Sequence, residues 1–152
     1  MSLHQQITTD LSAAMKARDK ARTSALRMVV SALKNQAIAD GKGPQGTLED
    51  AEVERVLATE VKRRREAAAA YREAGRTEQA EAEEAEAAVY EAYLPEQLSD
   101  DELAALVDAA IAEVGAEDVK QTGQVMKTVM PKVQGRADGS RVSALVKERL
   151  GG

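Results

Sequence analysis

The sequence predicts an all-α, multihelical protein, with an antiparallel helical bundle in its N-terminal part and a small three-helix domain in its C-terminal part. Apolar residues recur every three or four positions along most of the chain, and no convincing alternation typical of strands appears. Glycines and prolines interrupt this helical periodicity at intervals. The chain has no Phe or Trp, so its core must be built from Leu, Val, Ile, Met, Ala and three Tyr.

The first two expected helices are separated by a very short turn. One runs from about Leu3 to Arg18, with Ser2 as its N-cap. The next runs from about Lys20 to Asp40 and stops at a glycine-rich loop, residues 41–46.

A second pair of helices follows this loop. Thr47 is expected to cap a helix that ends at Gly75, and Thr77 to cap an alanine- and glutamate-rich helix that runs to Tyr93. Because long helices with short connections favour antiparallel neighbours, we expect these four helices to form one bundle.

The best domain boundary lies at Leu94–Pro95, because the residue before a proline is pushed out of helical geometry. It divides the chain into an N-terminal helical domain, residues 1–94, and a small C-terminal helical domain, residues 95–152. Soon after the boundary, Ser99 and Glu102 have the spacing of a capping box. They are expected to start a helix that ends at Gly115.

Two more helices complete the expected C-terminal domain. The first carries apolar residues from Val125 to Val133, and Pro131 should kink or shorten it. Asp138 is expected to cap the last helix, which ends near Leu150. A tight turn, residues 135–139, joins the two helices.

Charge is distributed unevenly along the chain, whose formal net charge is -5. Residues 95–118 contain eight acids and no base, whereas residues 119–152 contain seven bases and two acids, a net charge of +5. Such asymmetry can mark a surface that faces a partner.

Several functional classes are disfavoured by composition. The absence of Cys excludes disulfides and thiolate metal sites, and His4 is the only histidine. No signal-peptide core or membrane-length apolar run appears, so we expect a cytoplasmic protein with no membrane partner. No motif supplies a nucleophile with its base or a phosphate loop, so we predict no catalytic residue, no cofactor and no metal site.

Two charged clusters on the expected third and fourth helices have a structural interpretation. The basic run Lys62–Arg65 spreads around its helix, with Glu60 and Glu66 close enough to pair with it. The acids between Glu81 and Glu91 lack any associated histidine or nucleophile. We expect them to pair with bases of the preceding helix, namely Arg63, Arg64 and Arg72.

The C-terminal turn is the candidate functional site. Its flanking bases are suited to holding phosphates at single points along a backbone, and the turn itself is shaped by Gly135, Asp138 and Gly139. No aromatic residue is near, so base stacking is not available there. The alternative is that the glycines only supply turn geometry and the bases only solubilise. The candidate phosphate-binding residues are Lys127, Lys132, Arg136 and Arg141.

At these residues the chain resembles the GatB/YqeY family, specifically its small stand-alone YqeY-type members. The resemblance covers nearly the whole chain and rests on five segments in order. These segments are Leu26–Asn35, Glu60–Ala67, Tyr71–Arg76, Tyr93–Leu103 and Gly123–Gly139.

The resemblance implies a larger N-terminal helical bundle and a small C-terminal helical domain like the tail of the B subunit of glutamine-dependent tRNA amidotransferase. In that enzyme the tail helps to hold the tRNA body, while the chemistry occurs in a separate region that this chain lacks. The implied function is a non-catalytic tRNA-associated module, accessory to tRNA-dependent amidation. Two alternatives remain: an adaptor for an aminoacyl-tRNA synthetase or amidotransferase subunit, and a carbon–nitrogen ligase with glutamine as amido donor.

Overall fold

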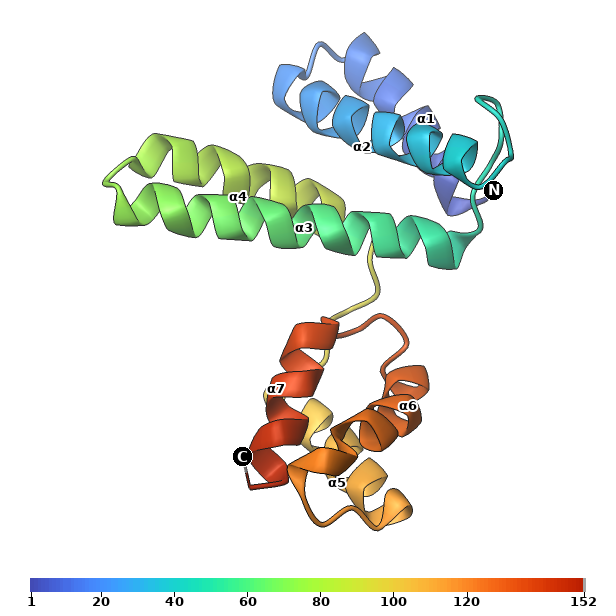
Figure 1. Cartoon of the computed structure of the whole chain (residues 1–152). Coiled ribbons are helices and arrows are strands. Elements are labelled where there is room, and N and C mark those ends of the chain that lie inside the picture. Colours follow the sequence, from blue (N-terminus) through green and yellow to red (C-terminus); the bar gives the residue numbers. More distant parts are fainter. Residues whose placement is uncertain (152) are drawn as a thin grey trace. The chain divides into compact units, whose positions relative to one another are not determined.

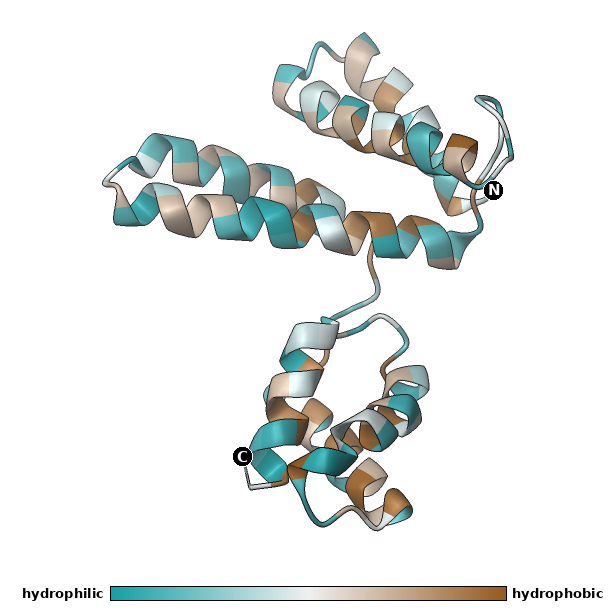
Figure 2. Ribbon diagram, in the orientation of Figure 1, coloured by the Kyte–Doolittle hydropathy of each residue, from teal (hydrophilic) through white to brown (hydrophobic). Residues whose placement is uncertain are grey.

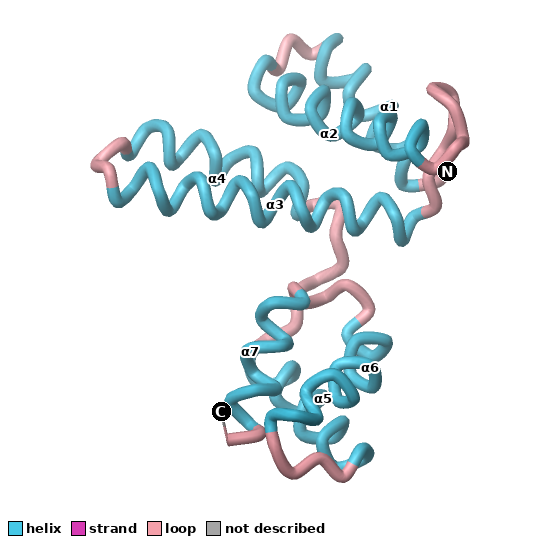
Figure 3. The backbone as a smooth tube through the Cα atoms, in the orientation of Figure 1, coloured by secondary structure: helices cyan, strands magenta, loops and turns pink. Residues whose placement is uncertain are grey.

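The computed structural model describes residues 1–151, and every regular element in that range is helical (Figures 1 and 3). The predicted all-α, multihelical fold is therefore confirmed. The chain packs into two compact units, Met1–Leu94 and a second that begins at Pro95. Each unit has its own cluster of buried apolar side chains.

The N-terminal unit begins with a helical hairpin made of α1 (Leu3–Lys16) and α2 (Lys20–Ala39). Ser2 caps α1 as predicted, and its side chain forms a reciprocal capping box with Gln5. Helix α1 ends two residues earlier than expected, because Arg18 adopts a left-handed conformation with φ of 57° that turns the chain into α2.

The second hairpin consists of α3 (Asp50–Glu73) and α4 (Thr77–Glu91) (Figure 1). The expected capping by Thr47 is wrong. The side chain of Leu48 is buried in the core, and the chain stays extended through Glu49, which occupies the N-cap position without a side-chain capping bond.

The second expected threonine cap is also wrong. Thr77 is the first residue of α4, and Arg76 precedes it as the N-cap residue without a side-chain capping bond. Gly75 does end the preceding turn, with a φ of 74° that glycine adopts without a steric penalty.

Two tyrosines on and just after α4 connect the hairpins of the N-terminal unit. The Tyr90 side chain is fully buried, and its hydroxyl donates to the Ala25 carbonyl of α2 at 2.7 Å. Burial raises the pKa of Tyr90 to about 12, so the hydroxyl keeps its proton. The Tyr93 hydroxyl donates to Asp10 of α1 and accepts from Arg22 of α2.

The C-terminal unit contains α5 (Asp100–Val114), a 3-10 turn (Val119–Gln121), α6 (Thr122–Val133) and α7 (Gly139–Arg149). Figure 2 shows apolar residues on the faces that α5, α6 and α7 turn toward one another. The core is aliphatic throughout. Its fully buried members include Val107, Val125, Val129, Val142 and Val146.

The Ser99 cap and the end of α5 at Gly115 follow the prediction, but the Glu102 side chain does not complete the expected capping box. The Ser99 hydroxyl accepts a hydrogen bond from the Glu102 backbone N–H at 3.1 Å, and Gly115 ends the helix with a φ of 72°. Within residues 1–151, no helix combines the length and the apolar character that crossing a membrane requires.

Candidate nucleic-acid interface

The turn between α6 and α7 is built by two consecutive left-handed residues. Pro131 lies inside α6, which continues for two more residues before Gln134 and Gly135 adopt φ values of 52° and 74°. These conformations end the helix and satisfy part of its open C-terminus, because the Gln134 N–H reaches the Met130 carbonyl at 3.4 Å. Of the predicted turn glycines, Gly135 therefore has the conformation that favours glycine.

The other two predicted turn residues play different roles from those expected. Gly139 is the first residue of α7, and its φ lies outside the left-handed region. A Cβ atom added there would meet no heavy atom within 4 Å. Asp138 occupies the N-cap position, but its carboxylate makes no capping hydrogen bond to the helix.

Two of the four candidate bases hold the entry segment of the C-terminal unit, which we define as residues 95–99. The Arg136 guanidinium donates from Nε to the Glu96 carbonyl at 2.9 Å, and the Leu98 N–H donates back to the Arg136 carbonyl at 2.7 Å. The Arg141 guanidinium donates to the Leu98 carbonyl at 3.0 Å. These bonds satisfy backbone groups that no helix satisfies, so both arginines are part of the fold.

The same two arginines also face acids of α5. Arg141 pairs with Asp100 at 2.7 Å, and Arg136 approaches Glu102 at 3.5 Å. About a third of each arginine side chain remains exposed. A guanidinium has five N–H donors, and these contacts use only some of them. Both side chains are thus held in place with an exposed edge.

The two lysines of α6 differ in their surroundings. Lys132 pairs with Glu113 of α5 at 2.9 Å, with both side chains largely exposed. Lys127 is exposed, and within residues 1–151 it forms no hydrogen bond or salt bridge. Surface pairs such as Lys132–Glu113 contribute on the order of 0–1 kcal/mol, so a phosphate can compete for this lysine.

The positive charge of α6 and α7 is therefore largely balanced by α5. A fourth pair, Arg149–Asp108 at 3.5 Å, adds to the three already described. Arg136 lies in the turn and Lys132 and Arg141 lie on the helices that flank it, whereas Lys127 lies further back along α6. Three of the four predicted bases contact acids, which are spread over both ends of α5. Sequence reasoning identified both charged segments without indicating that they pair with each other.

The charged clusters of the α3–α4 hairpin are paired largely as predicted. Arg64 contacts Glu86 at 2.9 Å and Arg72 forms a two-pronged pair with Glu84, in which each contact is 2.8 Å long. The hydrogen bond from Arg72 lowers the pKa of the Glu84 carboxyl. Arg63 is the exception, because it pairs within its own helix, with Glu60 at 3.3 Å.

His4 has a structural role that the sequence did not indicate. Its Nδ1 accepts a hydrogen bond from the Leu48 backbone N–H at 3.0 Å, which joins the start of α1 to the segment before α3. Partial burial lowers the pKa of His4, which favours the neutral ring that this contact requires. Across residues 1–151, no three His, Asp or Glu side chains converge into a potential metal site.

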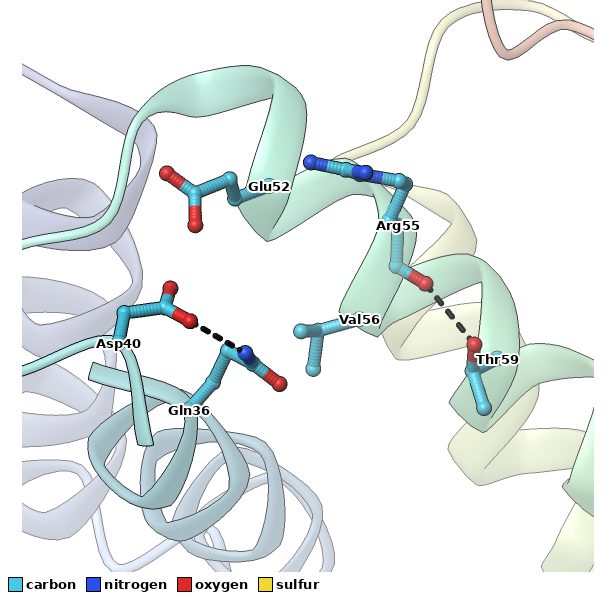
Figure 4. A pocket seen from close by; sticks show the side chains of 6 residues that line it. All are labelled: Gln36, Asp40, Glu52, Arg55, Val56 and Thr59. Atoms are coloured by element: carbon cyan, nitrogen blue, oxygen red, sulfur yellow. Dashed lines mark hydrogen bonds between the residues drawn. The ribbon is translucent and has the colours of Figure 1, made fainter. Parts of the chain in front are cut away.

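A polar cleft of about 370 Å³ lies between the C-terminal part of α2 and the N-terminal part of α3 (Figure 4). The Gln36 amide donates to Asp40, and the Thr59 hydroxyl donates to the Arg55 carbonyl. The Thr59 hydroxyl is thus bonded to the backbone, and within residues 1–151 no hydrogen bond links it to a side chain that could act as a general base. The cleft was not predicted from the sequence, and its lining is Gln36, Asp40, Glu52, Arg55, Val56 and Thr59.

Comparison with known families agrees with the five sequence segments that suggested a relationship. The family model described as Yqey-like protein matches residues 4–150, almost the whole chain. No curated protein matches the chain significantly. The matched family is related to the tail domain of the amidotransferase B subunit. The chain therefore belongs to the Yqey-like protein family.

Proposed function

We propose that this protein is a non-catalytic module that binds tRNA and serves as an accessory to tRNA-dependent amidation. Two considerations support the proposal. The family is related to an amidotransferase tail domain, and the C-terminal unit carries bases in the turn between α6 and α7 and on both helices that flank it.

The observation that carries the proposal is the charge of α6. This helix contains Lys127 and Lys132 and no acid, and both lysines are exposed. Lys127 is available for a phosphate without breaking any contact. Lys132 exchanges one exposed carboxylate partner for a phosphate at little cost.

Arg136 and Arg141 contribute in a different way from the lysines. Their contacts with the entry segment fix the positions of both guanidinium groups before any ligand arrives. A fixed guanidinium loses less conformational entropy on binding a phosphate than a flexible side chain does. We therefore assign them a positioning role, with their exposed edges as secondary phosphate contacts.

A tRNA titration at two salt concentrations tests this proposal. Phosphate contacts release counterions, so the affinity of the wild-type chain should fall steeply as salt rises. The double variant Lys127→Ala/Lys132→Ala should bind severalfold more weakly at low salt, with a shallower salt dependence. The matched control is Lys120→Ala/Lys147→Ala, which removes two exposed bases of the same unit.

Two results would overturn the proposal. The first is the absence of tRNA binding by the wild-type chain at low salt. The second is an equal loss of tRNA affinity in the α6 variant and in its control. That result would show that net charge alone, and not the position of the two lysines, determines binding.

A second candidate function is an adaptor that docks a basic protein, such as a synthetase or an amidotransferase subunit. The favouring observation is the highly exposed carboxylate of Asp100, whose side chain is 98% accessible, next to Asp101 at the start of α5. Capture of one defined translation enzyme that survives nuclease treatment would support this function over the first. Loss of capture on nuclease treatment would count against it.

A further inference from the structure

Helix α2 of the N-terminal unit carries four bases and no acid between Lys20 and Ala39. Three of these bases, Lys20, Arg27 and Lys34, are seven residues apart. Seven residues are close to two helical turns, so the three side chains lie on one face with about 10.5 Å between successive positions. We call this face the α2 stripe.

The bases of the α2 stripe are exposed and are not engaged in polar contacts within the described part of the chain. Within residues 1–151, none of the three side chains forms a hydrogen bond or a salt bridge. Exposed Ser24 and Ser31 lie between them on the same face. The fourth base, Arg22, points elsewhere, because it donates to the Tyr93 hydroxyl at 3.3 Å.

The segment that carries the α2 stripe has a net positive charge. Residues 1–39 contain six bases and only two acids, Asp10 and Asp19. Asp10 accepts from Tyr93, and Asp19 caps the start of α2, so both carboxylates are already engaged. Residues 40–94, in contrast, contain eight bases and fourteen acids, and many of those bases are paired within the α3–α4 hairpin.

We propose that the α2 stripe binds the sugar–phosphate backbone of a structured RNA, as a second contact surface distinct from the C-terminal turn. Lysine and arginine neutralise phosphates, and serine hydroxyls bond phosphate and ribose oxygens. The inference stands on α2 alone and does not depend on the bases of the C-terminal unit.

Other anionic partners fit this face less well. A membrane surface would need a continuous apolar face to insert. The apolar face of α2 is buried through Leu26, Val29 and Leu33, and its exposed large apolar residues are the two separate side chains of Met28 and Ile38. A protein partner would need an apolar or aromatic centre, because such residues dominate the energy of protein interfaces. Charged and hydroxyl side chains repeating along one helix face match a repeating phosphate backbone better.

The test uses the full chain and two RNA probes, unfractionated tRNA and a duplex RNA of about 20 base pairs, over a range of salt concentrations. The stripe variant is Lys20→Gln/Arg27→Gln/Lys34→Gln. The control variant, Arg55→Gln/Arg76→Gln/Lys147→Gln, removes the same charge from exposed bases outside the stripe. All substitutions are at exposed positions, and circular dichroism verifies that both variants keep the wild-type helicity.

The expected result is at least a tenfold loss of RNA affinity in the stripe variant and less than a threefold loss in the control. The slope of log affinity against log salt should become shallower by about two to three, since each phosphate contact contributes about 0.7–0.9. Equal affinities and slopes in the two variants would overturn the inference. So would binding of the wild-type chain to phosphatidylserine vesicles but to neither RNA probe.

The variants also separate this inference from the proposed tRNA function. If substitution of the α6 lysines weakens tRNA binding and substitution of the stripe does not, the proposed function stands and the inference fails. If the stripe variant loses duplex RNA binding while the chain shows no preference for tRNA, the inference stands and the tRNA assignment fails.

Discussion

The two units of the chain hold their helices together with different side chains. The N-terminal unit has all three tyrosines, and two of them, Tyr90 and Tyr93, bond across its hairpins. The C-terminal unit has no aromatic residue, and Arg136 and Arg141 connect its entry segment to the turn between α6 and α7 and to α7. Within residues 1–151, none of the three bases of the α2 stripe takes part in a hydrogen bond or salt bridge.

This difference shows that the formal charge of a segment does not indicate how many of its bases are free of salt bridges and can bind a ligand. The C-terminal segment, residues 119–152, has a net charge of +5, yet α5 supplies an acid for most of its bases near the turn. The positive charge of the first hairpin is less conspicuous in the sequence, because its bases are spread over a long helix. In the folded chain three of these bases, Lys20, Arg27 and Lys34, form no salt bridge within residues 1–151.

The largest loss of stability is expected when the contact between Tyr90 and α2 is removed. Replacing Tyr90 by Ala should lower the free energy of unfolding of the N-terminal unit by about 3–5 kcal/mol, because it deletes a fully buried aromatic side chain. Tyr90→Phe removes only the hydroxyl, which bonds the Ala25 carbonyl, and should cost about 1 kcal/mol. Hydrogen exchange read separately for peptides of each unit measures both. A Phe variant as unstable as the Ala variant would contradict this division.

The second prediction concerns arginines with and without structural contacts. Arg141→Ala should destabilise the C-terminal unit by about 1.5–3 kcal/mol, since it removes charge-assisted bonds to Leu98 and Asp100. Arg27→Ala should change stability by no more than about 0.5 kcal/mol, as is usual for uncommitted surface residues. Denaturant titration with hydrogen exchange provides the measurement. Equal losses of unfolding free energy in the two variants would contradict the distinction between structural arginines in the C-terminal unit and unpaired arginines in α2.

Much of the fold was predictable because helix signals are local. Gly75 and Gly115 end helical segments with positive φ, and Ser2 and Ser99 cap helices as their spacing indicated. The expected side-chain caps that failed were Thr47, Thr77 and Asp138. Thr47 failed because Leu48 is buried and Glu49 occupies the N-cap position instead.

The candidate site was less predictable because its contacts are long-range. The bond from Arg136 to the Glu96 carbonyl spans 40 residues, and the bond from Arg141 to the Leu98 carbonyl spans 43. No local pattern encodes such a pairing. The α2 stripe is different, because its seven-residue spacing of bases without acids is visible in the sequence once helix exposure is known.

A third prediction compares the two glycines of the C-terminal turn. Gly135→Ala should cost about 1–2 kcal/mol, because alanine is disfavoured at a φ of 74°. Gly139→Ala should be neutral or add up to about 1 kcal/mol, because it lies in a helix and open space surrounds its Cα. Thermal melts of the two variants measure the difference. Destabilisation of similar size at Gly139 would show that the turn requires both glycines.

The smallest expected effect concerns pH. Because the pKa of His4 is lowered by folding, the unfolded chain binds more protons than the folded chain in the pH range between the folded-state pKa and the ordinary histidine pKa of 6.5. The contribution of His4 is therefore fully present above about pH 6.5 and is lost as the pH falls through the lower pKa of the folded state.

The His4→Gln variant isolates this contribution. Its side chain does not titrate, so the difference in unfolding free energy between wild type and variant should shrink from pH 7.5 to pH 5.5. This difference can shrink by no more than the free energy of one hydrogen bond, about 0.5–1.5 kcal/mol. A difference that stays constant over this range would show that the contact between His4 and Leu48 is not sensitive to protonation.

The most direct test of the account is lysine footprinting of the full chain with and without tRNA. Amine-reactive labelling, read by mass spectrometry, reports the accessibility of each lysine. The account predicts that tRNA protects Lys20 and Lys34 of the α2 stripe and Lys127 of α6, while Lys147 of α7 stays reactive. Protection of Lys147 with continued labelling of the other three lysines would contradict it.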